Sequence, residues 1–267
     1  MDAASDESSL TAYHLSPIIF RLLTGREKVA SVKSGPFRHR PMHGHANPHG
    51  SQSPVMGAAQ PAITSRLRLL VTLASYGDKN LSHLKSIIAA YHRMAFDVHV
   101  VVVSNAPKDL GSDVTVAVGL PSKNPWSLPF AHKQVFADNV EKYDLFIYSE
   151  DDTEVTERNI NAFLELTPFL ADNEIAGYLR YELDAEGNRS FSGFHGPFHW
   201  KPDSVRTRGS QLVAEFSNDH AAFYLLTQKQ LKRCIASGGF LRSPCEGRYD
   251  MLCTAATDPY TNCGFRK

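Results

Sequence analysis

The chain has 267 residues, 42% of them hydrophobic, which is enough to bury the core of one large α/β domain or of two smaller ones. Its 28 basic and 28 acidic residues cancel, so no overall positive field is present to gather nucleic acid or an anionic membrane. No apolar run reaches the roughly 18 residues of a transmembrane segment, so we expect no such segment. We expect a soluble protein of the cytoplasm or, if the N-terminus is incomplete, of the secretory-pathway lumen.

Residues 1–64 are rich in Pro, His, Ser and Gly and show no sustained apolar period. Segments of this composition cannot bury enough apolar surface to offset the entropy of ordering the chain. We therefore predict a disordered, low-complexity tail at 1–64 and one folded domain at 65–267.

The folded part begins with a strand, a helix and a second strand. Leu67–Ala74 is an apolar run that ends in turn residues, and Val98–Ser104 is a β-branched run typical of a central strand. Between them, apolar residues recur at helical spacing from Leu81 to Tyr91. Together these segments predict a βαβ unit.

Helices and strands continue to alternate along the rest of the chain. Helical spacing runs from Phe130 to Tyr143, and the apolar strand Leu145–Tyr148 follows it. Thr156 and Thr227 are placed to cap two later helices, and Ala221–Leu226 is a further apolar strand.

The segments 176–183 and 189–194 flank a group of turn residues and predict a hairpin or a longer turn. We therefore predict an α/β fold with a mostly parallel, Rossmann-like sheet, helices on both of its faces and a small antiparallel portion.

Three consecutive acids, Glu150, Asp151 and Asp152, stand where the buried strand Leu145–Tyr148 ends. Adjacent carboxylates repel one another, and the strand offers no cationic partner in sequence, so a divalent ion is the natural compensation. Mg²⁺ and Mn²⁺ prefer carboxylates together with substrate phosphate oxygens, which predicts a phosphorylated substrate. The alternative is an acidic, solvated turn that caps the next helix.

Three segments together resemble the GT-A class of nucleotide-sugar glycosyltransferases, and the resemblance spans about 66–267. The residues that carry it are Val71–Asp78, Tyr143–Asp152 and Asn218–Gln230. In that class a DxD-type motif, written EDD in enzymes similar to N-acetylglucosaminyltransferase I, holds the metal bound to the sugar diphosphate.

The resemblance implies that Asp152 is the direct metal ligand. It implies that Glu150 and Asp151 contact the ribose, the sugar or metal-bound water. His220, in the polar loop before the strand at Ala221, is a candidate to complete the metal site, although a loop histidine is more often a surface group.

Further candidates for donor binding lie after the first two strands. Ser75, Tyr76 and Asp78 follow the first strand, where open α/β sheets place nucleotides. Tyr76 is suited to stack on a uracil-like base, and Asp78 can accept from base or ribose or can instead cap the following helix. Asn105, after the second strand, is a weaker candidate for the same nucleotide.

His132 and Lys133 lie near a predicted helix start, where several members of the class use basic residues against nucleotide or phosphate. A lysine there opposes the helix dipole unless an anion is nearby. The alternative is an exposed lysine on a solvated face.

Two late acids are candidates for the catalytic base that takes a proton from the acceptor hydroxyl. Asp250 is preferred and Glu246 is close behind; four residues apart at a predicted helix start, they would share one helix face. The alternative for Glu246 is a first-turn acid that the helix dipole favours.

The sequence therefore predicts a hexosyltransferase-type enzyme that depends on Mn²⁺ or Mg²⁺. We expect it to move a sugar from a nucleoside diphosphate donor to a hydroxyl group of a glycan, protein or small molecule, with inversion. Two alternatives stay open: a metal-dependent phosphoryl or nucleotidyl transferase, and a sugar-nucleotide binding module that has lost turnover.

Overall fold

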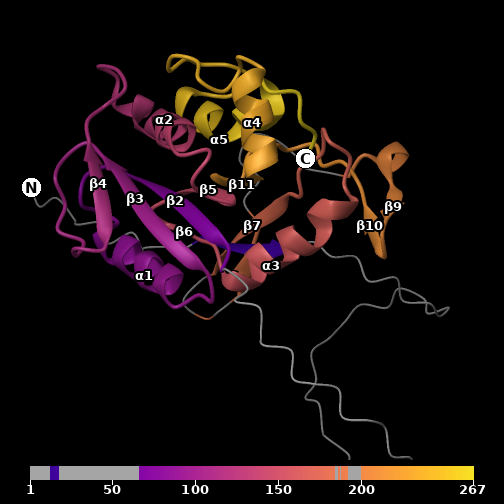
Figure 1. The fold of residues 1–267 in the computed structure, drawn as a ribbon, viewed down its shortest axis with the longest axis horizontal. Coiled ribbons are helices and arrows are strands. Elements are labelled where there is room, and N and C mark those ends of the chain that lie inside the picture. Colours follow the sequence, from indigo (N-terminus) through magenta and orange to yellow (C-terminus); the bar gives the residue numbers. More distant parts are fainter. Residues whose placement is uncertain (1–12, 18–65, 184–185, 187, 192–199) are drawn as a thin grey trace, which may run out of the picture. The chain divides into compact units, whose positions relative to one another are not determined.

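The computed structural model describes residues 13–17, 66–183, 186, 188–191 and 200–267 (Figure 1). The chain divides into two units, and all of the described residues lie in the unit formed by Met1–Arg21 and Arg66–Lys267. The other unit, Leu22–Ser65, lies outside the described residues, as does the rest of the segment 1–64 that we predict to be disordered, apart from 13–17.

A five-stranded sheet with the order β11-β5-β2-β3-β4 forms the centre of the fold. Its strands are β2 (Arg68–Ser75), β3 (Asp97–Ser104), β4 (Val114–Val118), β5 (Leu145–Glu150) and β11 (Phe223–Thr227). Neighbouring strands are parallel except for β11, which runs antiparallel to β5. The apolar runs of β2, β3 and β5 are almost fully buried, as expected for strands that are covered on both faces.

Helices cover both faces of this sheet (Figure 1). The helices of the described part are α1 (Leu81–His92), α2 (Ala131–Asp138), α3 (Glu157–Leu166), α4 (Gln228–Ala236) and α5 (Met251–Thr261), of which α1, α2 and α4 contact the central sheet. The connection β2-α1-β3 moves along the sheet in one direction and β4-α2-β5 in the other, so right-handed crossovers place α1 and α2 on opposite faces. Within the described residues, no helix combines the length and apolar character that crossing a bilayer requires.

Two smaller sheets complete the described part of the fold. One has the order β6-β1-β7-β8, and the other pairs β9 with β10. Their strands are β1 (Tyr13–Pro17), β6 (Thr153–Glu154), β7 (Tyr178–Leu183), β8 (Arg189–Ser190), β9 (Arg206–Arg208) and β10 (Gln211–Val213). The remaining regular elements are three 3₁₀ turns, η1 (Pro125–Phe130), η2 (Thr167–Phe169) and η3 (Pro202–Ser204).

The predicted fold class is confirmed, with local differences. The α/β arrangement, the mostly parallel sheet and the antiparallel β7–β8 hairpin are present. The capping boxes at Thr156 and Thr227 begin α3 and α4. The helix predicted from Phe130 to Tyr143 is shorter, because it starts after η1 and ends at Asp138.

Five strands of the described residues, β1, β4, β6, β9 and β10, are missing from the sequence prediction, and β1 and β4 show why. β4 is a five-residue edge strand whose residues are mostly half-buried or exposed, so it lacks the strong apolar run of the central strands. β1 lies inside the segment 1–64, where we predict no ordered element, and the prediction is therefore wrong for Tyr13–Pro17. The strand is formed by long-range pairing to β6 and β7, which local composition does not reveal.

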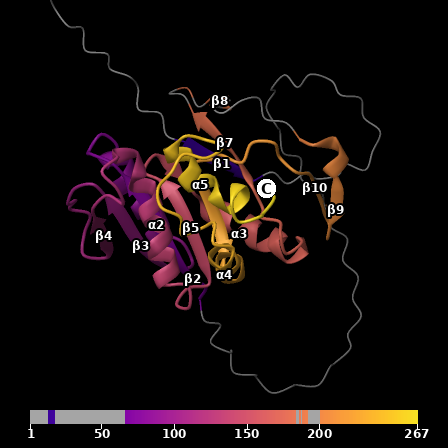
Figure 2. The ribbon, with the colours of Figure 1, turned by 90° about the horizontal axis from the view of Figure 1, so that it is seen from above.

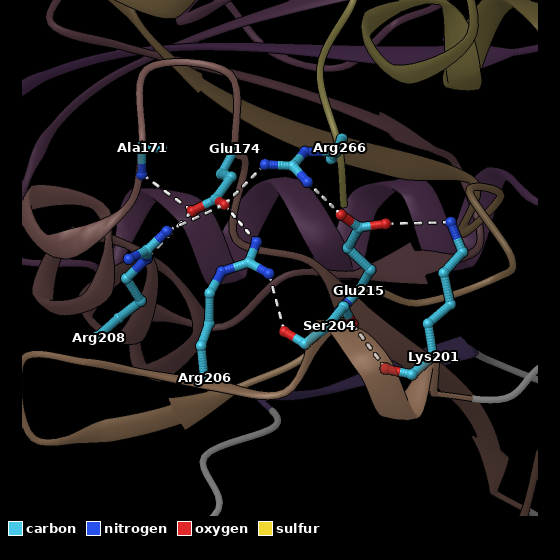
Figure 3. Close-up of polar contacts among 8 residues, drawn as sticks. All are labelled: Ala171, Glu174, Lys201, Ser204, Arg206, Arg208, Glu215 and Arg266. Atoms are coloured by element: carbon cyan, nitrogen blue, oxygen red, sulfur yellow. Dashed lines mark hydrogen bonds and ion pairs between the residues drawn. The ribbon is translucent and has the colours of Figure 1, made fainter.

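A buried carboxylate joins distant segments of the fold. Glu174 is 5% exposed and accepts hydrogen bonds from the Ala171 N–H at 2.9 Å and from the side chains of Arg206, Arg208 and Arg266 (Figure 3). Burial alone would raise the pKa of Glu174, but these donors outweigh it and lower the pKa to about 2. The cluster ties the segment that follows η2 to β9 and to the last residues of the chain.

We predict that Glu174→Gln removes a pH-dependent part of the stability. Since the pKa of Glu174 falls from 4.5 in the unfolded chain to about 2, its stabilisation is complete above pH 4.5 and is lost as the pH falls toward 2. We expect the variant to be less stable by about 2 kcal/mol at pH 7 and equal to the parent near pH 2. Urea unfolding at pH 7, 4 and 2.5 measures this, with the exposed Glu165→Gln as control; a constant difference at all pH values would contradict it.

Candidate functional site

Polar side chains gather where the parallel strands of the central sheet end. The loop after β2, the loop after β3 and the acids at the end of β5 meet at this edge, because parallel strands share the direction of their carboxyl ends. A cavity of about 350 Å³ opens there. It is lined by Ala74, Tyr76, Asn80, Pro125, Trp126, Leu128, Pro129, Glu150, Asp151, Asp152 and Leu252.

The three acids are held by different parts of the backbone. Glu150 is the last residue of β5 and is half-buried, so the first acid belongs to the strand and the turn comprises Asp151 and Asp152. Asp151 is 7% exposed; its N–H donates to the Ala74 carbonyl at 3.2 Å, and its Oδ1 accepts from Asn80 Nδ2 at 2.8 Å. Asp152 Oδ1 accepts from the Thr153 hydroxyl at 3.3 Å.

The carboxylates raise one another's pKa values. Burial and then the charge of Asp152 raise the pKa of Glu150 to about 8, and burial and then Asp151 raise the pKa of Asp152. Arg180 of β7 opposes both shifts, while the charge of Asp250 adds to the shift of Glu150. The charge of a fourth acid therefore acts on the first acid of the triplet, and the site favours a bound proton or a cation.

The donor set suits a dication that arrives with a phosphorylated ligand. No group of three or more His, Cys, Asp or Glu side chains within the described ranges is arranged to hold a metal ion by itself. Mg²⁺ needs only one or two carboxylates when phosphate oxygens complete its coordination, and the acids here have pKa values that a cation would lower. Asp152 and Asp151 thus fit such an ion. His220 does not belong to a metal-ligating group of the described residues, and its ring lies 6.5 Å from that of Tyr249.

Two aromatic rings stand at the mouth of the cavity. Tyr76 is 53% exposed and Trp126, from η1, is 51% exposed. The turn that carries Tyr76 depends on Gly77, whose φ of 62° is in the left-handed region and whose N–H donates to Asn105 Oδ1 at 2.8 Å. Exposed rings beside a cavity are suited to stacking on a planar base.

The other predicted donor residues take different positions. Ser75 is 1% exposed, and its hydroxyl has no hydrogen-bond partner among the described residues. Asn105 uses its side-chain oxygen to fix the Gly77 turn. Asp78 is exposed and lies 3.1 Å from Lys108 Nζ; it does not cap the helix, because the N-cap of α1 is Asn80.

The structure corrects the expectation for His132 and Lys133, because both are buried on the α2 side of the sheet. His132 donates from Nδ1 to the Pro129 carbonyl and accepts at Nε2 from the Tyr224 hydroxyl, and burial lowers its pKa. Lys133 is paired with Asp258 of α5. The anion that balances the lysine at the helix start is thus the carboxylate of Asp258 and not a ligand. Neither His132 nor Lys133 lines the cavity beside the triplet.

The two candidate bases also separate. Asp250 is the N-cap of α5 and accepts from the Cys253 N–H at 2.9 Å, whereas Glu246 is exposed in the preceding irregular segment. The expectation that they share one helix face is wrong, because the helix begins only at Met251. Of the two acids, Asp250 is the one whose charge contributes to the raised pKa of Glu150.

Three residues of the site are absent from the sequence prediction. Asn80 orients Asp151, Trp126 lines the cavity, and Arg180 faces the acids. Asn80 carries a weak signal as a polar residue just before a helix. Trp126 and Arg180 lie in segments whose position beside the triplet depends on the tertiary fold.

Comparison with known proteins identifies no family, because no family model and no curated protein matches the chain. Among solved structures, the chain is similar to one described as the crystal structure of 4-diphosphocytidyl-2C-methyl-D-erythritol synthase. The similarity has 12% sequence identity and a TM-score of 0.33, and covers 64% of this chain and 80% of that chain. The GT-A assignment stays a prediction, and the function has to be inferred from the site.

We predict that Glu150→Gln stabilises the metal-free protein at high pH. Since the pKa of Glu150 rises from 4.5 to about 8 on folding, the folded state retains a proton that the unfolded chain has released, and stability falls as the pH rises across this window. The variant avoids this loss. We expect it to match the parent near pH 4.5 and to exceed it by about 1 kcal/mol at pH 8.5.

Urea unfolding in the presence of a chelator measures the difference. Glu165→Gln, on an exposed position of α3, is the matched control and should show no pH-dependent gain. A Glu150→Gln protein that is less stable than the parent at pH 8.5 would show that the carboxylate is not under repulsion.

Proposed function

We propose that this protein is a metal-dependent transferase that moves a sugar from a nucleoside diphosphate sugar to a hydroxyl acceptor, with inversion. The observation that carries the proposal is that Glu150, Asp151 and Asp152 line a cavity together with two exposed aromatic rings, while the charge of Asp250 acts on Glu150. The cavity of about 350 Å³ falls in the size range of small-ligand sites.

The residues of the cavity divide into those that would bind the base of the donor and those that would hold the ion against its diphosphate. Tyr76 and Trp126 supply stacking surfaces for the base. Asp152, with Asp151 oriented by Asn80, would hold Mn²⁺ or Mg²⁺ against the diphosphate. When bound, the ion supplies positive charge that stabilises the departing phosphate oxygens. Glu150 lines the same cavity and contributes negative charge when the ion is bound.

Asp250 is the proposed base. Its carboxylate is fixed by the N–H at the start of α5, and it lies near enough to the triplet to influence the pKa of Glu150. As the acceptor oxygen forms its bond to the anomeric carbon and the bond to the diphosphate breaks, the acceptor proton passes to Asp250. Glu246, which is exposed, is a less suitable second choice.

The surrounding charges favour a hydroxyl acceptor over a phosphate acceptor. The largest charge effects on Glu150 within the described residues come from Asp152, Asp151 and Asp250 and, in opposition, from Arg180. These carboxylates would repel an attacking phosphate because both carry negative charge. A neutral hydroxyl is not repelled, and it needs a carboxylate base to take its proton. Nucleotidyl or phosphoryl transfer would use the same acids and is the second candidate; a binding module without turnover is the third.

We predict that Asp152→Asn and Asp250→Asn lose activity for different reasons. Asp152→Asn should lose Mn²⁺-dependent binding of nucleoside diphosphate and at least about 100-fold in kcat/KM. Asp250→Asn should keep that binding and lose kcat by about 100-fold or more, because only the proton acceptor is removed. A panel of nucleotide sugars with Mn²⁺, read by thermal shift and by donor hydrolysis, measures both effects.

Asp172→Asn, a remote exposed acid paired with Lys229, is the matched control and should behave as the parent. Release of pyrophosphate or inorganic phosphate without sugar transfer would support the second candidate instead. Saturable binding without any product would support the binding module, and no response to any nucleotide or dication would contradict the proposal.

A further inference from the structure

A strand from the N-terminal part of the chain occupies the interior of the second sheet. β1 lies between β6 and β7, parallel to the former and antiparallel to the latter, and Figure 2 shows it alongside β7. β6 is at the edge of this sheet, where its sheet neighbour is β1. Residues 18–152 separate β1 from β6 in the sequence, so the pairing is distant along the chain.

β6 directly continues the carboxylate turn. The first half of the turn is held by the central sheet, because Glu150 ends β5 and the Asp151 N–H donates to the Ala74 carbonyl. The second half leads into Thr153–Glu154, which pair with Tyr13 and His14 of β1. The backbone that carries Asp151 and Asp152 is thus anchored on one side by β2 and on the other by β1.

β7 brings the opposing cation to the same acids. Arg180 lies on β7, opposite Leu15 of β1 in the register of the sheet. Its charge acts on both Glu150 and Asp152. β1 therefore connects the strand that continues the acidic turn with the strand that carries the cation facing it.

We propose that the space between β6 and β7 is a strand-binding groove, filled by Tyr13–Pro17 of the same chain, whose occupancy sets the geometry of the carboxylate turn. Extended segments join sheet edges through main-chain hydrogen bonds, and removing β1 would leave backbone groups of β6 and β7 unpaired. The central sheet does not include β1 and would persist. The effect on dication binding rests on the proposed function, whereas the effect on backbone order does not.

Deleting residues 1–21 tests the groove by hydrogen exchange. We expect amides at 153–154 and 178–182 to exchange at least about tenfold faster, while β2 and β3 keep their protection. Affinity for Mn²⁺, measured in the presence of a nucleoside diphosphate, should fall at least about fivefold. A peptide of residues 10–20 should reverse both effects at a few millimolar, because an attached segment is present at an effective concentration on the order of millimolar.

Two controls isolate the strand. Deletion of residues 1–10 retains β1 and should behave as the full chain. The same peptide with Leu15→Pro lacks a main-chain donor within the strand and should restore less protection. If the chain without 1–21 fails to fold, full-length His14→Pro and Leu15→Pro provide the same test, since successive N–H groups of a strand face opposite neighbours.

Unchanged exchange at 153–154 after removal or disruption of β1 would overturn the proposal. Faster exchange with unchanged Mn²⁺ affinity would overturn its link to the carboxylates. If exchange accelerates and the peptide reverses it, but the full-length chain binds no Mn²⁺ even with a nucleoside diphosphate present, the groove stands and the proposed function fails.

Discussion

The mutual repulsion of carboxylates at the end of a buried strand is the constraint on which the site depends. β5 lies between β2 and β11, so Glu150 cannot swing freely into solvent. Asn80 ties Asp151 to the α1 side of the site. Acids that cannot move apart must take up protons or a cation, which is the direction in which the pKa values of Glu150 and Asp152 are shifted.

The buried polar residues of α2 act on this site through α5. Lys133 pairs with Asp258, and both side chains are almost completely buried, which joins α2 to α5. Because Asp250 is the N-cap of α5, this pair helps to place the proposed base. His132 stacks on Tyr148 with 4.0 Å between ring centroids and bonds to Tyr224, so it is part of the same packed layer. These basic residues contribute to the position of the base without touching the cavity.

Much of the fold follows from local sequence signals, and much of the site does not. The strands β2, β3 and β5 are long buried runs, and α3 and α4 start at capping boxes, so periodicity and capping predict them. β1 and β4 depend on partners far away in the sequence. In the same way, the triplet is visible as a pattern, but the burial of Lys133 and the approach of Arg180 arise from tertiary packing.

The edge of the sheet that holds the acids also holds backbone strain. Ala222 is buried and has a φ of 56°, a left-handed conformation that costs a residue with a side chain about 1 kcal/mol or more. It immediately precedes β11, and its neighbour Phe223 pairs with Ser149, the residue before the triplet. Because β11 is antiparallel, the chain must enter the sheet at the edge where the other strands leave it. Strain and like-charge repulsion therefore lie side by side, and both are tolerated because the buried central strands fix the backbone around them.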